Sequence, residues 1–214
     1  MAKIILDFGS GNTCQNDWDY VKKMIDELKA VDTGKHEVII KWQLFLQAGQ
    51  NIPLDREIFC KAYDYAKELG YQTTSSVFDL ESLSFLLQFD VPFVKLANRR
   101  ELDWLIGEVP RKVPVYVSYG SYEEMSSSKP FTNNIVPLRC LSQYPATFED
   151  YINIVESWFC GPDVLAISDH TTNFGLWYRY QPKIIEWHYV LEHDPGNLDG
   201  GLFARTPEQL REVL

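Results

Sequence analysis

Short apolar runs rich in β-branched and aromatic residues alternate with longer segments of helical periodicity along the whole chain. The short runs predict eight strands, at residues 3–8, 37–42, 71–75, 92–96, 113–117, 135–140, 164–167 and 184–188. The longer segments predict helices at residues 17–30, 55–69, 80–88, 100–107, 148–158, 173–180 and 206–214. Two helices carry start signals, because Asp79 precedes an apolar-periodic run and Thr206 precedes a proline.

Eight strands, each followed by a helix or a short link, are typical of a closed parallel barrel, because parallel strands need crossover connections and helices on their faces. We therefore expect residues 1–214 to form one domain, a compact α/β protein with the (β/α)8 TIM-barrel fold. An open doubly wound sheet is the alternative. Such barrels usually have about 250 residues, so some crossovers must be short. The polar, serine-rich residues 120–134, interrupted by Pro130, predict a fifth crossover without a helix.

The composition limits the classes of function. Hydrophobic residues make up 45% of the chain, and 30 acidic against 20 basic residues give a net charge of -10, the wrong sign for broad binding to nucleic acid or anionic lipid. The chain shows neither a signal-peptide pattern nor an apolar stretch near the ~20 residues that cross a bilayer. Cys14, Cys60, Cys140 and Cys160 are widely spaced and favour reduced thiols over disulfides. We expect a soluble cytoplasmic protein without nucleic-acid or membrane partners.

Polar side chains collect at the carboxyl ends of the predicted strands, where barrel enzymes place their catalytic groups. They are Asp7, Lys41, Gln43, Ser75, Ser76, Lys95, Ser118, Ser142, Ser168, Asp169, His170, Glu186 and His188. A single lysine after an apolar run, such as Lys95, is often a boundary residue whose ammonium reaches water. Two lysines at corresponding strand ends, Lys41 and Lys95, surrounded by serines, instead favour a cradle for phosphate or carboxylate oxygens.

The four histidines divide into two pairs. His36 and His193 are predicted to be structural residues held by hydrogen bonds. His170 and His188 end the seventh and eighth strands, which would be neighbours about 4.8 Å apart, so both imidazoles could reach one ion. Two nitrogen ligands with open positions suit a catalytic Mn²⁺, Mg²⁺, Zn²⁺ or Fe²⁺ better than a closed structural zinc site. Spacing alone leaves a structural role for this pair open.

Several motifs, taken in chain order, resemble those of sialic acid synthases. They are K-W-Q (41–43), S-S-V-F-D (75–79), V-P-F-V-K (91–95), V-S-Y-G (117–120), C-L-S-Q-Y-P (140–145), I-S-D-H-T (167–171), E-W-H (186–188) and Asp199. The resemblance covers nearly the whole chain, and its motifs are specific as an ordered set although each is weak alone. It implies the family's β/α barrel and condensation of phosphoenolpyruvate with N-acetylmannosamine or a related sugar.

The resemblance also implies roles for individual residues. His170 and His188 would hold a divalent metal, Mn²⁺ or Mg²⁺, that polarises the sugar aldehyde as a Lewis acid. The enol carbon would attack that aldehyde, and water would add before phosphate departs. The implied catalytic residues are Asp7, Lys41, Lys95 and Glu186. The implied substrate-binding residues are Gln43, Ser76, Asn98, Ser118, Ser142, Ser168 and Asp199.

The sequence also departs from the family pattern. Asn98 stands in place of a small-residue turn with a phosphate-binding serine, although Arg99 or Arg100 can add charge there. The other departures are Ser76-Val77 for threonine-proline, Arg139 for histidine, Asp7 for glutamate, and Gly11-Asn12-Thr13 without a histidine. The family normally continues into an antifreeze-like domain that covers a partner's barrel, whereas this sequence ends at Leu214. Three alternatives stay open: a separate protein caps the mouth, the acceptor differs, or activity on a conventional hexosamine has been lost. An interleaved dimer of the family type is not expected, whereas an ordinary homodimer stays open as a partner.

Three hypotheses follow. The leading one is a metal-dependent synthase that joins phosphoenolpyruvate to a sugar aldehyde. The second is a non-catalytic barrel that binds a sugar or a phosphorylated metabolite. The third is an aldolase or lyase that uses Lys95 or Lys41 as a Schiff base, which leaves the histidine pair without a purpose.

Overall fold

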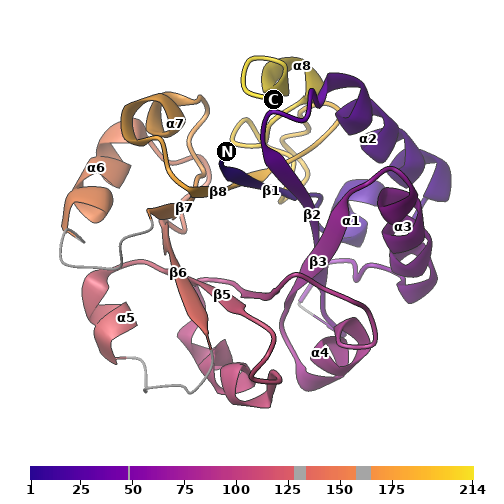
Figure 1. Cartoon of the computed structure of the whole chain (residues 1–214), viewed down its shortest axis with the longest axis horizontal. Coiled ribbons are helices and arrows are strands. Elements are labelled where there is room, and N and C mark those ends of the chain that lie inside the picture. The colour runs from indigo at the N-terminus through magenta and orange to yellow at the C-terminus, as the bar shows by residue number, and fades with distance from the viewer. Residues whose placement is uncertain (48, 128–133, 158–164) are drawn as a thin grey trace.

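The computed structural model describes residues 1–47, 49–127, 134–157 and 165–214, and these form a closed barrel of parallel strands with helices outside (Figure 1). Each strand pairs with the next in the chain, and β1 pairs with β8, which closes the ring. The strands are β1 (Lys3–Asp7), β2 (Glu37–Leu44), β3 (Gln72–Val77), β4 (Val94–Leu96), β5 (Val115–Tyr119), β6 (Ile135–Cys140), β7 (Ala166–Ser168) and β8 (Ile184–His188). The predicted TIM barrel is confirmed.

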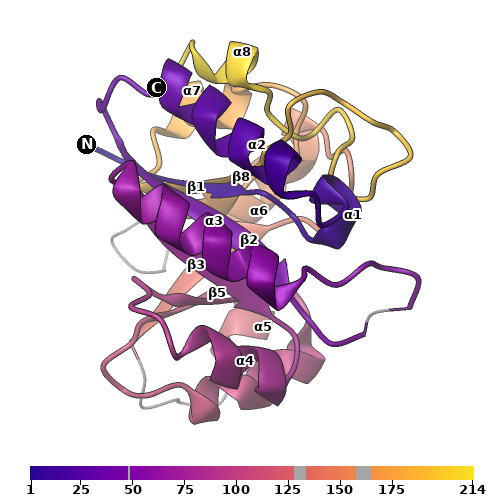
Figure 2. The same ribbon diagram turned by 90° about the vertical axis from the view of Figure 1, so that its right-hand side faces the viewer.

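The crossovers carry helices of very different length. They are α1 (Gly11–Cys14), α2 (Trp18–Val31), α3 (Arg56–Glu68), α4 (Leu80–Leu86), the 3₁₀ helix η1 (Arg100–Glu108), α5 (Tyr122–Ser127), α6 (Phe148–Ser157), α7 (Gly175–Tyr180) and α8 (Pro207–Leu210). Figure 2 shows the long loops after β2 and β8 projecting from the same end of the barrel, opposite both chain termini. The carboxyl ends of the strands therefore open into a mouth bordered by loops. None of the helices in the described ranges has the length and apolar character needed to cross a membrane.

Side-chain caps explain where several helices begin. The Asp17 carboxylate accepts hydrogen bonds from the Asp19 and Tyr20 amides at the start of α2, and Asp55 does the same at the start of α3. At α8, Thr206 and Gln209 form a reciprocal capping box. These caps satisfy amide groups that have no partner within the helix.

Some predicted elements were wrong or displaced. The fifth crossover contains α5, because Ser121 accepts a hydrogen bond from the Glu124 amide and Glu124 accepts one from the Gly120 amide, so local capping compensates for the polar sequence. The helix predicted at 100–107 is a 3₁₀ helix, in which Leu102 and Leu105, three residues apart, are both buried. The α1 turn, capped by Ser10, was not predicted.

Other elements differ only in their limits. The helix predicted from 173 begins at Gly175, and the one predicted to reach 214 ends at Leu210. The predicted helix end at 158, the predicted strand start at 164 and Cys160 lie outside the described residues. Cys14, Cys60 and Cys140 form no disulfide within the described ranges.

The barrel interior is closed below the mouth by an apolar layer. Its members are Ile5, Ile39, Phe93, Tyr116, Leu138, Ala166 and Ile184. The Phe93 and Tyr116 rings stack there with centroids 3.9 Å apart. A larger apolar cluster that includes Val21, Phe59 and Leu105 packs on the helix side. The lumen is therefore a packed core and not a pore.

Candidate active site

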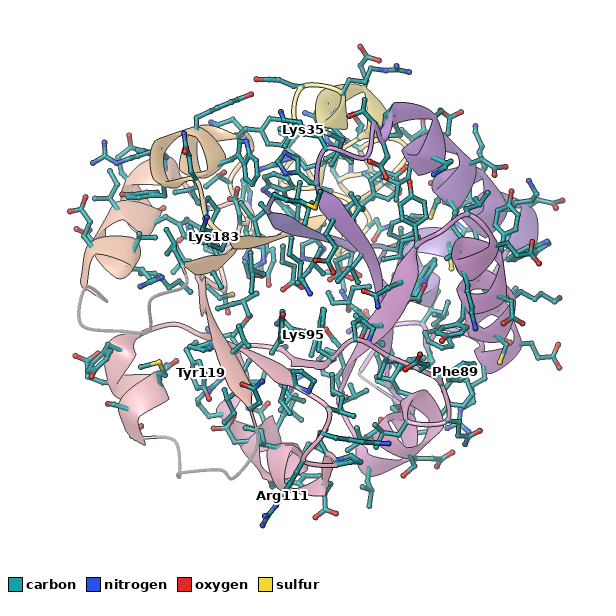
Figure 3. The ribbon with its side chains drawn as sticks, viewed as in Figure 1. Lys35, Phe89, Lys95, Arg111, Tyr119 and Lys183 are labelled. Carbon is teal, nitrogen blue, oxygen red and sulfur yellow. The ribbon has the colours of Figure 1, made fainter. Side chains whose placement is uncertain are left out.

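The mouth of the barrel is a cavity of about 510 Å³ lined by polar side chains. Its position follows from strand geometry, because side chains two residues apart on a strand share a face. Asp7, Lys41 and Lys95 each lie two residues beyond a member of the apolar layer, and so they occupy the next layer of the lumen. Figure 3 shows Lys95 inside the ring of strands, whereas Arg111 lies at the periphery.

Every residue that was assigned a catalytic, substrate-binding or metal role lines this cavity, whereas Ser75 and Asp169, which also end strands, do not. The set comprises Asp7, Lys41, Gln43, Ser76, Lys95, Asn98, Ser118, Ser142, Ser168, His170, Glu186, His188 and Asp199. Asn98 and Ser142 lie at the rim, where the Asn98 amide donates to the Ser142 hydroxyl at 3.1 Å. The fold therefore brings together residues from all eight strand ends and the loop after β8. Their individual roles in binding and catalysis stay predictions.

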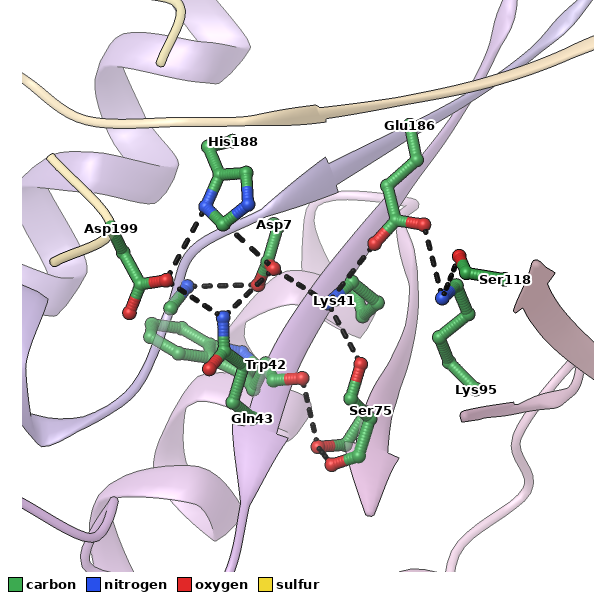
Figure 4. Close-up of polar contacts among 12 residues, drawn as sticks. Asp7, Lys41, Trp42, Gln43, Ser75, Lys95, Ser118, Glu186, His188 and Asp199 are labelled. Atoms are coloured by element: carbon green, nitrogen blue, oxygen red, sulfur yellow. Dashed lines mark hydrogen bonds and ion pairs between the residues drawn. The ribbon is translucent and has the colours of Figure 1, made fainter. Parts of the chain in front are cut away.

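One half of the mouth is organised around two buried lysines (Figure 4). The Lys41 ammonium lies 2.7 Å from Asp7 Oδ2 and 3.2 Å from Glu186 Oε1, and it donates to the Ser76 hydroxyl at 2.9 Å. The Lys95 ammonium lies 3.5 Å from Glu186 Oε2 and donates to the Ser118 hydroxyl at 2.7 Å. Glu186 thus bridges the two cations and balances part of their charge.

Burial and the neighbouring opposite charges shift the pKa values of this cluster in opposite directions. Burial lowers the pKa of Lys41, but Asp7 and Glu186 outweigh it and the pKa is raised, so Lys41 stays an ammonium ion. Burial prevails at Lys95, whose pKa is lowered although Glu186 opposes the shift. At Glu186 burial is outweighed by Lys95 and Lys41, and its pKa is lowered. At Asp7, Lys41 and His188 likewise outweigh burial and lower the pKa to about 2.

The other half of the mouth holds the two imidazoles, His170 and His188, with ring centroids 5.4 Å apart. His170 Nδ1 lies 2.6 Å from the Leu141 carbonyl oxygen, an acceptor, so this nitrogen carries the proton and Nε2 is left with its lone pair. His188 Nδ1 lies 3.4 Å from Asp199 Oδ1 and 3.9 Å from Asp7 Oδ2.

The donor set fits a divalent ion held by two imidazoles. Burial, with a smaller contribution from His188, lowers the pKa of His170 to about 3, so the ring is neutral as a metal ligand must be. Within the described ranges no group of three or more His, Cys, Asp or Glu side chains is arranged around one ion. His170 and His188 would therefore supply two ligands, and water and substrate would supply the others. The remaining histidines contact backbone, His36 with the Ala2 amide and His193 with the Ala204 carbonyl.

A polar bridge connects the imidazoles to the lysine half. The Gln43 amide donates to Asp7 Oδ2 at 2.9 Å and to Asp199 Oδ1 at 3.0 Å. Burial raises the pKa of Asp199, although His188 opposes the shift. Two carboxyl groups therefore share one amide while their pKa values are displaced in opposite directions, because Asp7 contacts a lysine and Asp199 does not.

Sequence reasoning missed part of the lining. Tyr144 packs its ring over His170 at 4.2 Å between centroids, and it contacts His188 and Phe203 as well. Asn51, Phe78 and Leu198 also line the cavity. Tyr144 lies in the C-L-S-Q-Y-P motif and Phe78 in the S-S-V-F-D motif, which were the available signals, whereas no sequence pattern marked Asn51 and Leu198.

The chain is similar to known proteins in both sequence and fold. The sequence profile of the NeuB family matches residues 22–214. A search of curated protein sequences found no significant match. Among solved structures, the N-acetylneuraminic acid synthetase of Leptospira borgpetersenii matches with a TM-score of 0.80 at 20% identity, over 98% of this chain and 80% of that chain.

Two further structures have the same fold. The spore coat polysaccharide biosynthesis protein spsE of Bacillus subtilis matches with a TM-score of 0.79 at 20% identity, over 99% of this chain and 65% of that chain. A truncated 3-deoxy-D-arabino-heptulosonate 7-phosphate synthase of Thermotoga maritima matches with a TM-score of 0.66 at 13% identity, over 99% of this chain and 83% of that chain. The structural likenesses show a shared barrel, and the profile match extends over most of the sequence. The chain belongs to the NeuB family.

Proposed function

We propose that this protein joins phosphoenolpyruvate to the aldehyde carbon of an N-acetylmannosamine-like aldose, giving a sialic-acid-like 2-keto sugar acid and phosphate. The observation that carries the proposal is the division of one cavity into a half with two buried lysines and a half with two imidazoles. The lysine half suits a small anion, and the imidazole half suits an aldehyde whose carbonyl oxygen a metal ion polarises. Membership of the NeuB family supports the same reaction class.

The lysine half is suited to the phosphoenolpyruvate. Lys41 and Lys95 would hold its carboxylate and phosphate oxygens as point charges, and the hydroxyls of Ser76 and Ser118 already lie against them as further donors. Asn98 and Ser142 at the rim would add hydrogen bonds. Because these donors stand in place before the anion arrives, little reorganisation is needed as negative charge moves onto the leaving phosphate.

The imidazole half is suited to the aldehyde. His170 and His188 would hold Mn²⁺ or Mg²⁺, which supplies Lewis-acid polarisation of the carbonyl. Asp199 lies 3.4 Å from His188 Nδ1, beside the position of that ion, and its carboxyl group would relay a proton to the aldehyde oxygen. Gln43 and Asp7 would orient the sugar hydroxyls through the polar bridge described above.

The proposed reaction forms a carbon–carbon bond and breaks the C2–O bond to phosphate. The methylene carbon of phosphoenolpyruvate forms a bond to the aldehyde carbon, and the aldehyde oxygen takes a proton and becomes a hydroxyl. Water adds to the cationic C2 carbon and loses one proton, which leaves a hydroxyl on C2. The C2–O bond to phosphate then breaks while this hydroxyl passes its proton to the departing phosphate, and the keto group remains. Glu186 is placed to accept the proton of that water, because it is an anion whose Oε2 atom faces Lys95 at 3.5 Å but accepts no hydrogen bond within the described part of the chain.

The test is phosphate release from phosphoenolpyruvate, followed with a panel of hexosamines and pentoses. We expect release only when Mn²⁺ or Mg²⁺ and an aldose are both present, and none from His170→Ala or His188→Ala. His36→Ala is the matched control, because His36 lies outside the cavity and bonds to the backbone. Absence of release with every acceptor would contradict the proposal. Binding of phosphoenolpyruvate without turnover would then favour a non-catalytic barrel.

A further inference from the structure

Arg205, in the loop between β8 and α8, carries a charge that no solvent reaches. One terminal nitrogen of its guanidinium donates to the Thr171 and Phe203 carbonyls, both at 2.8 Å. The other donates to the Asn173 carbonyl at 2.7 Å and lies 3.3 Å from Asp169 Oδ2. The side chain therefore contacts three residues of the segment after β7, and these residues lie on both sides of His170 in the chain.

Asp169 is the charged partner of this arginine and the residue before His170. Its carboxylate also accepts hydrogen bonds from the Thr171 amide and from the Trp187 indole, both at 2.8 Å. Its own amide donates to the Glu186 carbonyl at 2.9 Å. Asp169 is fully buried, so its orientation is set by these contacts and not by water. The peptide that carries His170 is thereby tied to β8.

The backbone of Arg205 reaches the second histidine. Its amide donates to the His188 carbonyl at 2.7 Å, and its carbonyl accepts from the Val190 amide at 3.1 Å. One residue thus bonds to the backbone of His188 through its main chain and to both neighbours of His170 through its side chain. Arg205, which solvent does not reach, therefore connects the two histidine segments.

We propose that Arg205 is a positioning residue that sets the separation and orientation of His170 and His188, now 5.4 Å apart between ring centroids. The ring of His170 is directed by its Nδ1 bond to Leu141, and that bond holds only while the peptide after β7 stays in place. The inference rests on the proposed function in one respect, namely that these imidazoles hold a divalent ion.

The decisive variant is Arg205→Lys, which keeps the positive charge but cannot reach four acceptors with one ammonium. Two measurements are made on folded protein. The affinity for Mn²⁺ alone is followed by electron paramagnetic resonance, and the ring nitrogens of the metal-free protein are followed by ¹⁵N-resolved NMR. We expect Mn²⁺ binding to weaken about tenfold or more, since partners that orient metal ligands have effects of this size. The Nδ1–H signal of His170 should shift or broaden.

Leu28→Ala is the matched control, because Leu28 is fully buried in α2 and its truncation lowers stability away from the mouth. Asp169→Asn is a second, near-isosteric variant that weakens the same link if Arg205→Lys does not fold. Both Asp169→Asn and Arg205→Lys should alter the His170 ring signal, whereas Leu28→Ala should not. A role in stability alone would lower the melting temperature of all three and leave Mn²⁺ affinity and ring signals unchanged, which would overturn the inference. If the wild type binds no Mn²⁺, the proposed metal site fails and the ring signals decide the positioning role.

Discussion

The bridge that Glu186 makes between two buried lysines provides a sharp test of the charge arrangement. Glu186→Gln keeps the shape of the side chain and removes its charge. The carboxylate lies 3.2 Å from Lys41 and 3.5 Å from Lys95, and all three side chains are nearly inaccessible to solvent. The variant therefore leaves two buried ammonium groups with Asp7 as their nearest counter-charge.

The expected loss of stability follows from the distances between Glu186 and the two lysines. At an effective dielectric constant near 20, each contact represents roughly 5 kcal/mol of attraction, most of which is offset by the cost of burying the charges. Removing one partner from a buried ion pair typically costs about 3–5 kcal/mol, because the other charge stays buried without compensation. For a protein of this size, each kcal/mol lowers the melting temperature by about 2–4 °C. We expect Glu186→Gln to melt about 10 °C below the wild type.

Thermal unfolding followed by circular dichroism, with and without inorganic phosphate, measures the effect. Phosphate should raise the melting temperature of Glu186→Gln more than that of the wild type, because Glu186 no longer competes with the anion for the lysines. The control is Glu81→Gln, which removes an exposed ion pair with Arg56 and should change stability by less than about 1 kcal/mol. A melting temperature within about 2 °C of the wild type, with no larger phosphate gain, would refute the reasoning.

Other predictions concern single contacts. The pKa of Asp7 is lowered to about 2, so its carboxylate stabilises the fold above about pH 4, and this stability is lost as the pH falls toward 2. In urea unfolding, Asp7→Asn should therefore cost about 2 kcal/mol at pH 7 and about half of that at pH 3. Ser118→Ala removes the hydroxyl that accepts a hydrogen bond from Lys95. It should raise the KM for phosphoenolpyruvate about tenfold in the phosphate-release assay and lower the stability by about 1–3 kcal/mol. Phe59→Ala empties a fully buried position and should cost about 3–5 kcal/mol in urea unfolding. Asp55→Ala removes the cap of α3 and should cost about 1 kcal/mol, with unchanged KM.

The alternation of short apolar runs with longer helical segments was enough to predict the strands. Strands of a parallel barrel are buried on both faces and read as short apolar runs, whereas a surface helix repeats its apolar positions about every 3.6 residues. Helix starts were predictable where a short polar side chain caps free amides, as at Thr206. The prediction failed at α5, where Ser121 and Glu124 cap a polar segment that carries no apolar period. The 3₁₀ form of η1 was also missed, since its apolar spacing fits either helix type.

The candidate site was predictable for a related reason. A parallel barrel places every strand's carboxyl end at one mouth, so polar residues that end strands must meet once the ring closes. Ring closure alone therefore brings Lys41, Lys95, His170 and His188 together, whatever contacts they make. The position of Tyr144, whose ring covers His170 from a loop, was not predictable, because the path of a loop has no sequence periodicity.

The sequence by itself determined which side chains face the lumen, since two-residue periodicity places Lys41 above Ile39 and Lys95 above Phe93 whatever the surroundings. Only the tertiary structure decided how these groups are charged and held. Glu186 lies between two lysines from β2 and β4, and Arg205 reaches Asp169, 36 residues away along the chain. Such contacts form between segments that ring closure brings together. Their strength depends on burial, which removes the competing water and has no local signature in the chain.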